Sequence, residues 1–451
     1  MDFRLETASS RIALLAICSF VAVLFCYEAI RLELAEHRIW SDDLAKMQSA
    51  AALEPGYAEY WDRLGRFLQF GLDEQNFPDA LHNYEKAVKI SPLTARYWID
   101  LAIAHENLGD IEKARKEFDE ARKDYPGSAE VRWEYANFLL RQGQVPVALK
   151  EMRTAVQEDS SLLPLSINRA WRATNDPDQV ADAMLPNTAA AYIEAINFFA
   201  GEEDVSAGLK IWRRLADSHQ PFEIERLFPF LDVAIQQNRG ADGKRMWLEA
   251  LAACGLPHDM PTDGSVVLNG GFEHDVLNGG FDWRLPSGWG MTADYDTSIH
   301  HGGQRSLRLD FGGGMNMDLR QPLQFVAVDP AQTYHLDGFI RTENITTESG
   351  VRFYVYDPRY QDQIYLHTDD LTGTHDWTEL QGNVTTGPDT QILQIEVHRI
   401  PSRLFDNKLG GTAWIDDVAL VPAPVVGSAA GKSAATAEAA PATPAPHQGI
   451  Q

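Results

Sequence analysis

The chain has 451 residues, enough for two or three domains with a sizeable core. Its 65 acidic and 39 basic residues give a formal net charge of −26. This charge argues against a nucleic-acid partner, because nucleic-acid-binding surfaces need clustered Lys and Arg. Cys18 and Cys26 lie in an apolar N-terminal stretch and only Cys254 lies in the remainder, so no disulfide is predicted within that remainder.

The N-terminus predicts a membrane anchor. Residues 1–10 are polar, and residues 11–30 form an apolar run in which Glu28 is the only charge after Arg11. About 19 residues at ~1.5 Å each span roughly 28 Å, close to the hydrocarbon thickness of a bilayer. We therefore expect one transmembrane helix. A cleaved signal peptide is the alternative, but no small-x-small site follows the run. Neither cysteine fits a lipoprotein site, since a bulky residue precedes each.

Basic residues do not fix the orientation of this helix, because they flank it on both sides: Arg4 and Arg11 before it, and Arg31, Arg38 and Lys46 after it. We expect an inner-membrane protein with the bulk of the chain on the periplasmic side, mainly because of the character of the C-terminal domain. Residues 31–57 continue as a charged connecting helix that leads into a repeated region.

Residues 58–160 contain three units of two amphipathic helices each. Small residues recur with a period of 34 at the same place in each second helix: Ala80, Ala114 and Ala148, and again Ala87, Ala121 and Ala155. The middle unit, residues 95–126, is the most regular, with apolar residues at i, i+3, i+4 and i+7 on facing stripes. Its two helices break at Leu108-Gly109-Asp110, which predicts a helical hairpin.

This pattern resembles the tetratricopeptide repeat, whose consensus sets a large residue, Leu-Gly or Leu-Ala, Ala, an aromatic, Ala and Pro in order. The first unit supplies all of these: Trp61, Leu64, Gly65, Ala80, Tyr84, Ala87 and Pro92. The third unit departs from the consensus, since Trp133 sits one place late, Met152 replaces the aromatic residue and Ser160 replaces the proline. Because one hairpin cannot bury its own apolar face, the resemblance implies a stacked α-solenoid.

Residues 161–255 lose the register but keep the hairpin pattern. We expect two further hairpins there, formed by 192–199 with 209–216 and by 224–235 with 244–253. Residues 256–264 then form a Pro/Gly/Asp linker.

Residues 265–422 change to alternating segments bounded by Gly, Pro, Asn or Asp, which predicts an antiparallel β-sandwich. The segments are SLRLDF, TYHLDGFIR, VRFYVYD, WTELQGNV, QILQIEVHR and AWIDDVALV. The opening NGGFE, a downstream Trp-Gly, a Gly-rich turn before SLRL and the closing DDV resemble the galactose-binding-like jelly rolls, in particular bacterial carbohydrate-binding modules. Residues 423–451 are rich in Ala, Pro, Ser and Thr, and we expect them to be disordered.

The predicted fold class is therefore multidomain: an all-α solenoid of tetratricopeptide repeats, an all-β jelly-roll sandwich and one N-terminal transmembrane helix. The jelly-roll resemblance also implies a structural calcium ion that ties the first and last strands together. Its implied ligands are Glu273, one of Asp416 or Asp417, and carbonyl groups near residues 301–303. The alternative is that these carboxylates are solvated strand ends.

Sugar recognition needs aromatic rings for the apolar side of a pyranose and planar polar groups for its hydroxyls. In VRFYVYD, alternation points every second residue to the core and leaves Arg352, Tyr354 and Tyr356 on the other face. We expect this face to bind carbohydrate together with residues from other segments: Trp283, Arg341, Glu396 and His398. The alternative is that these are ordinary cross-strand pairs and that Trp283 plugs one end of the sandwich.

The helical region offers a second surface. The tetratricopeptide resemblance implies a concave groove for a protein partner, lined by Arg66, Gln69, Arg96, Glu106, Trp133, Asn137 and Arg141. Trp133 is the candidate anchor, because a buried aromatic side chain can dominate binding. Its displacement into the core of a degenerate unit is the alternative. The basic clamp of chaperone-binding repeats is not reproduced, so a C-terminal carboxylate ligand is not implied.

The sequence contains no HExxH, GxSxG or CxxC motif. Asp369-Asp370 and Asp416-Asp417 are adjacent pairs whose side chains point to opposite faces of a strand, so neither is a natural acid/base couple. We therefore expect a non-enzymatic, membrane-anchored scaffold of the cell envelope, associated with exopolysaccharide or O-antigen production or export. One alternative is a purely structural protein whose sandwich caps the solenoid. Another is an accessory module of polysaccharide hydrolysis.

Overall fold

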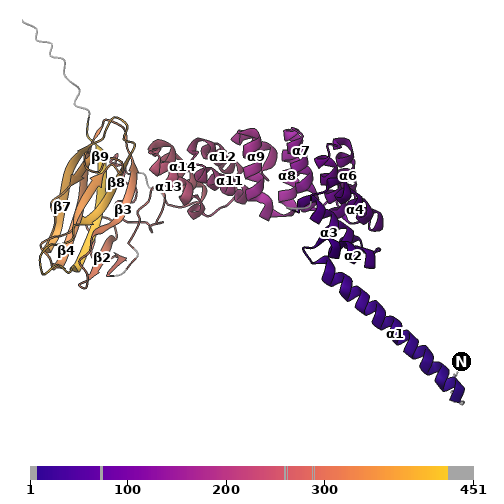
Figure 1. Ribbon diagram of the computed structural model, residues 1–451. Helices are drawn as coiled ribbons and strands as arrows, with labels where there is room; N and C mark the ends of the chain where they lie inside the picture. The colour runs from indigo at the N-terminus through magenta and orange to yellow at the C-terminus, as the bar shows by residue number, and fades with distance from the viewer. Residues whose placement is uncertain are drawn as a thin grey trace, which may run out of the picture. The chain divides into compact units, whose positions relative to one another are not determined.

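The computed structural model describes residues 8–71, 75–257, 261, 263–286, 288 and 290–424. It divides into two compact units (Figure 1). The first unit holds the chain up to Gln237 together with Arg245–Leu256, and the second holds Asn238–Lys244 and the chain from Pro257. Of the predicted disordered tail, only Ala423 and Pro424 are among the described residues. The prediction of a helical repeat region followed by a β-sandwich is confirmed.

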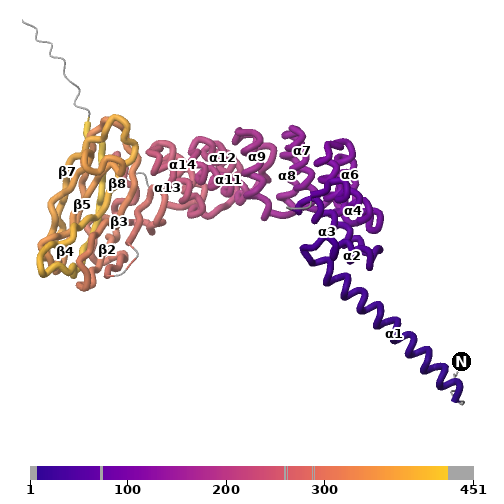
Figure 2. Tube along the Cα trace, in the orientation of Figure 1, coloured from indigo at the N-terminus to yellow at the C-terminus, as the bar shows by residue number. Residues whose placement is uncertain are grey.

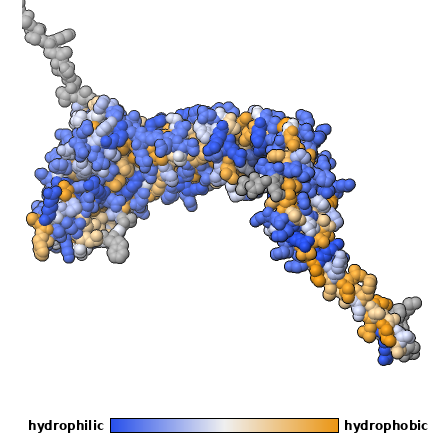
Figure 3. All heavy atoms as spheres, in the orientation of Figure 1, coloured by the Kyte–Doolittle hydropathy of each residue, from blue (hydrophilic) through white to orange (hydrophobic). Residues whose placement is uncertain are grey.

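The N-terminal helix α1 runs without a break from Ala8 to Ile39. Its apolar side chains are exposed, with Phe25 at 73 %, and Figure 3 shows these apolar residues along the helix. Burial begins only at Ala35 and Ile39, in a cluster that also contains residues of α2 (Leu44–Leu53). By length and composition, α1 is the one helix among the described residues that is suited to cross a membrane.

The charged stretch after the apolar run contains the end of α1 and all of α2. Asp43 caps α2, since its carboxylate accepts hydrogen bonds from the backbone N–H of Ala45 at 2.9 Å and of Lys46 at 3.3 Å. The cap explains why the chain starts a new helix here instead of extending α1.

Three helical hairpins follow: α3 (Ala58–Phe70) with α4 (Phe77–Ile90), α5 (Ala95–Asn107) with α6 (Ile111–Asp124), and α7 (Ala129–Arg141) with α8 (Val145–Glu158). The alanines of the 34-residue period are fully buried in all three. Small residues are needed there because the two helices of a hairpin cross closely. A Cβ added at Gly65 of α3, for example, would lie 2.7 Å from the ring of Tyr84 in α4.

In each of these three hairpins, a side chain of the first helix donates a hydrogen bond to a proline carbonyl in the preceding turn. The indole N–H of Trp61 donates to the carbonyl of Pro55 at 3.0 Å, and that of Trp98 donates to Pro92 at 2.7 Å. In the third hairpin, Nε of Arg132 donates to the carbonyl of Pro126 at 3.0 Å. Arg132 therefore makes the hydrogen bond that the consensus tryptophan makes in the other two hairpins, and Trp133 does not make it.

A fourth hairpin was not predicted from the sequence. It pairs α9 (Leu163–Thr174) with a short α10 (Pro177–Gln179) that passes into a π-helical turn at Val180–Met184. The two predicted hairpins follow, as α11 (Ala189–Gly201) with α12 (Val205–Ser218), and as α13 (Phe228–Gln236) with α14 (Gly240–Ala253). Figure 2 shows successive hairpins stacked beside one another. We call α3 to α14 the helical array.

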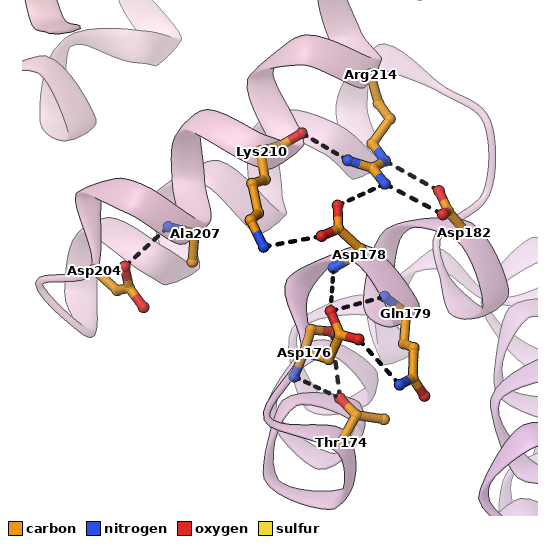
Figure 4. Close-up of polar contacts among 9 residues, drawn as sticks. All are labelled: Thr174, Asp176, Asp178, Gln179, Asp182, Asp204, Ala207, Lys210 and Arg214. Carbon is orange, nitrogen blue, oxygen red and sulfur yellow. Dashed lines mark hydrogen bonds and ion pairs between the residues drawn. The ribbon is translucent and has the colours of Figure 1, made fainter.

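Ion pairs compensate for the shortness of α10 (Figure 4). Asp178 lies 2.9 Å from Nζ of Lys210 and 2.7 Å from the guanidinium of Arg214, both in α12. Arg214 also contacts Asp182 of the π-helical turn at 3.0 Å. The broken second helix is thus fastened to the next hairpin by charge as well as by apolar contact.

The second unit is a sandwich of two antiparallel sheets. The five-stranded sheet has the order β1-β2-β9-β4-β7 and the four-stranded sheet the order β3-β8-β5-β6. The strands are β1 (Met291–Asp296), β2 (Ser306–Gly312), β3 (Leu319–Ala327), β4 (Thr333–Ile345), β5 (Arg352–Tyr356), β6 (Tyr365–His367), β7 (Gly373–Thr385), β8 (Ile392–Arg399) and β9 (Gly410–Pro422). All six alternating segments of the sequence form strands, while β1, β3 and β6 were not predicted.

The sandwich core contains side chains from both sheets. Leu309 and Leu336 of the five-stranded sheet and Phe353 and Val397 of the four-stranded sheet are fully buried in one cluster. Because alternate residues of a strand face opposite sides, the residues between these positions form the two outer faces of the sandwich. Those outer faces carry the candidate site.

Candidate functional site

Five predicted sugar-binding residues lie together on the outer face of the four-stranded sheet. Arg352 of β5 is directly opposite His398 of β8, and Tyr354 is directly opposite Glu396. Tyr356 is the next outward residue of β5. We call this surface the tyrosine face. The sheet register therefore brings two distant stretches of the chain into one surface.

The tyrosine face extends onto two strands that sequence reasoning missed. Tyr365 of β6 lies opposite Tyr356 and His367 lies opposite Tyr354, while Arg320 of β3 lies opposite His398. The ring of Tyr354 is 4.7 Å from that of Tyr356 and 6.3 Å from that of Tyr365. Tyr365 is 48 % exposed, so a ligand reaches this cluster from solvent. The alternation Tyr-Leu-His is a signal, but three residues are too short a stretch to stand out.

A buried hydrogen-bond network holds the centre of the tyrosine face. Glu396 is fully buried, and its Oε2 accepts from Nε2 of Gln394 at 2.8 Å and from the hydroxyl of Tyr356 at 3.3 Å. Nδ1 of His398 lies 2.7 Å from Glu396 Oε1. Burial, and after it the Glu396 carboxylate, raises the pKa of Tyr356 well above its usual value, so its hydroxyl stays protonated. The network fixes the rotamers of the groups that it joins.

Two predicted members do not lie on this face. Arg341 belongs to β4 of the other sheet, where it is opposite Trp414 and pairs with Asp376. Trp283 is fully buried, its ring lies 5.1 Å from that of Phe272, and its indole N–H donates to the carbonyl of Asn269 at 3.1 Å. Trp283 therefore lies in the interior of the domain and does not belong to the tyrosine face.

The three carboxylates predicted to bind calcium meet at residues 301–305. Asp416 is fully buried, and its Oδ2 accepts from the backbone N–H of His301 at 2.7 Å and of Gly302 at 3.1 Å. Asp417 lies 2.7 Å from Nδ1 of His301. Glu273 accepts from the backbone N–H of Gln304 at 2.9 Å. The segment that opens the domain and its last strand thus both contact residues 301–305.

Glycine is required where these carboxylates meet. A Cβ at Gly302 would collide with Asp417, and one at Gly303, whose φ is +57°, would collide with Glu273. Burial raises the pKa of Asp416 to about 6. Within the described residues, however, no group of three or more His, Cys, Asp or Glu side chains is arranged to hold a metal ion. Backbone N–H groups take up much of the acceptor capacity, so calcium stays a prediction.

The predicted groove residues lie on the first helices of the hairpins, and each of the charged ones lies near an opposite charge of the helical array. Arg66 of α3 holds Asp100 of α5 through two hydrogen bonds of 2.7 and 2.9 Å. Arg141 of α7 holds Glu106 of α5 through two more, of 2.9 and 2.7 Å. Arg96 lies 4.0 Å from Asp100 of its own helix. The contacts of Arg66 and Arg141 bridge successive repeats.

Below these bridges lie polar side chains with few partners. Burial, and after it the Asp100 carboxylate, raises the pKa of Asp62 to about 8. Gln69 and Asn137 are 2 % and 4 % exposed. In the described part of the chain, neither the oxygen nor the nitrogen of the Gln69 amide has a hydrogen-bond partner, and Oδ1 of Asn137 has none either. The amides predicted for the groove are therefore mostly covered.

Trp133 is only half-buried, and the guanidinium of Arg169 in α9 lies 5.4 Å from the centre of its ring. Displacement into the core is therefore not what the structure shows. Among the predicted groove residues, Trp133 is the one that still presents an aromatic surface.

Comparison with known families supports both parts of this reading. A family model described as Tetratricopeptide repeat matches residues 72–128 and 99–162, and one described as Carbohydrate binding domain matches residues 264–403. The chain therefore contains tetratricopeptide repeats and a carbohydrate-binding domain with a β-sandwich fold. None of the curated proteins matches the chain.

Three solved structures are similar to this chain. PilF of Pseudomonas aeruginosa is 17 % identical over 44 % of this chain and 92 % of its own, with a TM-score of 0.27. YrrB, described as a TPR protein with an unusual peptide-binding site, is 13 % identical over 46 % and 91 %, with a TM-score of 0.24. Yeast Tom70 is 19 % identical over 49 % of each chain, with a TM-score of 0.29.

Proposed function

We propose that this protein is a non-enzymatic, membrane-anchored scaffold of the cell envelope that binds polysaccharide through its sandwich and recruits a protein partner through its helical array. The observation that carries the sugar half is the tyrosine face, where three tyrosines surround the buried Glu396 network. Aromatic rings suit the apolar side of a pyranose, and the fixed polar groups between them suit its hydroxyls.

Two observations support the assignment of this role to the tyrosine face. The carbohydrate-binding family model covers β3, β5, β6 and β8 completely. The face is also prearranged, because Glu396 is already bonded to Tyr356, Gln394 and His398. A prearranged site loses less conformational entropy when a ligand binds.

The membrane half of the proposal rests on α1, whose exposed apolar length suits a bilayer. We place the array and the sandwich outside the cytoplasm, on the periplasmic side of the inner membrane, where polysaccharide is assembled and exported. A role in exopolysaccharide or O-antigen production or export follows from combining an anchor, a partner-binding array and a sugar-binding module.

The sugar half is tested with the full-length protein in detergent on a glycan array, with and without calcium. Tyr354→Ala should weaken binding at least tenfold, because one aromatic ring is lost from the centre of the face. The matched control is Trp377→Ala, a half-buried aromatic of β7 in the other sheet, which should bind like the wild type. Absence of binding to any glycan by the folded wild-type protein would remove this half.

A purely structural role is the second candidate, and the bridges between repeats favour it. Because Arg66, Arg96 and Arg141 already contact carboxylates of the array, its concave side does not need a partner to neutralise them. Pull-down with wild-type protein and with Trp133→Ala separates the two candidates. Loss of a specific partner with unchanged folding supports recruitment through the groove, whereas an identical set of partners supports the structural role. Turnover of a glycan by the purified protein would favour the hydrolytic alternative instead.

A further inference from the structure

Three loops meet at one end of the sandwich. They join β2 to β3, β4 to β5 and β8 to β9, and they comprise residues 313–318, 346–351 and 400–409. The strand register brings them together, since Gly312, which ends β2, is opposite Gly410, which begins β9. In the other sheet, Leu319, which begins β3, is opposite Arg399, which ends β8. We call this region the loop end of the sandwich.

Large apolar side chains of the loop end are exposed to solvent. Phe405 is fully exposed, and Leu404, Ile400 and Met315 are 59 %, 53 % and 48 % exposed. We call these four residues the apolar tip. The other large apolar side chains exposed in the described part of the sandwich are both tyrosines, whose hydroxyl groups can bond to water. The tip side chains carry no hydroxyl, amide or charge, and exposed apolar patches of this kind mark sites of interaction.

A buried arginine fixes the loops that carry the tip. Arg399 is fully buried, and its guanidinium donates to one backbone carbonyl in each loop: Ser349 at 3.1 Å, Met317 at 2.6 Å and Asn407 at 3.3 Å. A guanidinium has five N–H donors in a rigid plane, so it can hold several chain segments at once. Because the loops are already held in place, the tip loses little conformational freedom when it docks.

A second link joins two of the loops directly. Nδ2 of Asn316 donates to the carbonyl of Ser402 at 2.9 Å, and Oδ1 of Asn316 accepts from the backbone N–H of Ser402 at 3.0 Å. Asn316 follows Met315, and Ser402 is two residues before Leu404. The link therefore holds the apolar residues of both loops at the same end of the sandwich.

The charges of the loop end balance. The three loops and Arg399 contain three basic and three acidic residues: Arg399, Arg403, Lys408, Asp318, Glu348 and Asp406. A surface without net charge is neither drawn to anionic lipids nor kept away from them by long-range forces. Docking through the tip therefore depends on its apolar area.

The chemistry and the size of the tip favour a bilayer over a sugar or a protein. A sugar needs polar groups for its hydroxyls, and the tip side chains offer none. A stable protein interface buries roughly 800 Å² on each partner, from about 20–30 residues, which four side chains do not supply. The acyl layer of a bilayer deforms around protruding apolar side chains, so each buried methylene adds to binding. The chain also carries a helix suited to cross such a bilayer.

We propose that the apolar tip inserts into the acyl layer of a phospholipid bilayer, so that the sandwich docks on a membrane surface through Leu404, Phe405 and their neighbours in the tip. This inference goes beyond the proposed function, because no residue of the tip belongs to the tyrosine face. Insertion needs no anionic lipid, since the loop end has no net charge.

The test reads the surroundings of the tip in full-length protein reconstituted into phosphatidylcholine vesicles. Cys18, Cys26 and Cys254 are replaced by alanine, and Leu404→Cys carries an environment-sensitive fluorophore. We expect blue-shifted emission that is largely quenched by nitroxide groups on the lipid acyl chains. The matched control is the same fluorophore at Thr297→Cys, which is exposed just after β1 at the opposite end of the sandwich and should not be quenched.

Substitution of the unlabelled tip residues shows whether these side chains drive insertion. With the fluorophore at Leu404→Cys, Ile400→Ser and Phe405→Ser together should abolish the quenching, because they remove apolar area from exposed positions. Added phosphatidylglycerol or salt should leave the quenching unchanged. Circular dichroism checks that each variant is folded, and glycan binding by the double variant should equal that of the wild type.

Other results overturn the proposal. No quenching at Leu404→Cys in the folded protein, or equal quenching at Thr297→Cys, would mean that the tip does not insert. Blue-shifted emission that lipid nitroxide does not quench, and that grows with protein density in the vesicle, would mean that a second copy covers the tip. Quenching with anionic lipid alone would mean that charge, and not apolar area, brings this surface to the membrane. Loss of glycan binding by the double variant would assign the tip to the sugar site instead.

Discussion

The predicted groove of the helical array and the tyrosine face use similar side chains in different ways. In the array, the guanidinium of Arg66 is bonded to Asp100, and that of Arg141 is bonded to Glu106. On the tyrosine face, the internal network is centred on Glu396, and Arg352 pairs with Asp370 through one guanidinium nitrogen while its Nε has no partner among the described residues. Charged residues in a predicted groove therefore indicate a binding site only after their mutual contacts have been counted.

The difference leads to separate expectations for stability and for binding. Changes in the array should alter its stability and leave sugar binding intact, since the bridges join one repeat to the next. Changes in the sandwich should show the reverse wherever they remove outward groups. Four experiments test this separation, in order of decreasing expected effect.

The largest effect is expected from Phe118→Ala. Phe118 is fully buried in α6, and its ring lies 5.1 Å from Phe138 and 5.6 Å from Tyr135 of α7. The cavity should destabilise the array by about 4 kcal/mol. Urea unfolding followed by the helical circular dichroism signal measures the loss, and calorimetry should find glycan binding of the folded variant unchanged. A tenfold loss of that binding would show that the two parts are not separable.

The second-largest effect is expected from pH, which should change the stability of the array through Asp62. The folded-state pKa of Asp62 is raised from 3.8 to about 8, chiefly by burial and then by Asp100, so folding favours the protonated acid. The unfolded chain releases the Asp62 proton near pH 4, whereas the folded array keeps it until about pH 8. The free energy of unfolding should therefore be highest below about pH 4 and fall as the pH rises, by about 3 kcal/mol between pH 5 and 8. Asp62→Asn should flatten this slope in urea unfolding. An unchanged slope would mean that Asp62 is ionised in the folded array.

Calcium should act on the sandwich alone. If Glu273, Asp416 and Asp417 hold the ion, a hundredfold excess over its dissociation constant adds about 2.7 kcal/mol of stability. Thermal unfolding of the sandwich signal with calcium and with a chelator measures the gain, and Asp416→Asn should abolish it. An equal melting temperature with calcium and with chelator would mean that these carboxylates only accept hydrogen bonds and do not bind calcium. The array transition serves as the internal control.

The smallest effects are expected from removing the ion pairs between repeats, and they should be larger for a buried pair than for an exposed one. Asp100 is 5 % exposed, and Asp100→Ala leaves the guanidinium of Arg66 without its main partner, which should cost about 2 kcal/mol. The side chain of Arg141 is 47 % exposed, so Arg141→Ala should cost less than about 1 kcal/mol. Urea midpoints measure both. Equal costs would contradict the view that burial sets the strength of a bridge.

Much of the fold could be predicted from the sequence, because one physical requirement recurs. A small residue is needed wherever two helices of a hairpin cross, so the buried alanines mark each repeat. The fourth hairpin lacks this register, and its second helix is shortened by the π-helical turn at Val180–Met184. Among the strands, β3 contains Pro322 and β6 has three residues, so neither gives an alternation long enough to recognise.

The candidate site was predictable to the extent that alternation decides it. In β5 and β8, side-chain parity assigned Arg352, Tyr354, Glu396 and His398 correctly to one outer face. Parity gives the face of a strand but not the sheet to which the strand belongs, which is why Arg341 was misplaced. Strand order depends on long-range pairing, and this also hid the position of Arg320 opposite His398.

The bridges of the array have a consequence for its evolution. Arg66 with Asp100, and Arg141 with Glu106, each fasten one first helix to its immediate neighbour along the stack. No bridge of this kind has to be rebuilt elsewhere when a hairpin is duplicated or deleted, because the new junction involves only adjoining copies. The length of the array can therefore change by whole hairpins without changes at the remaining interfaces between hairpins.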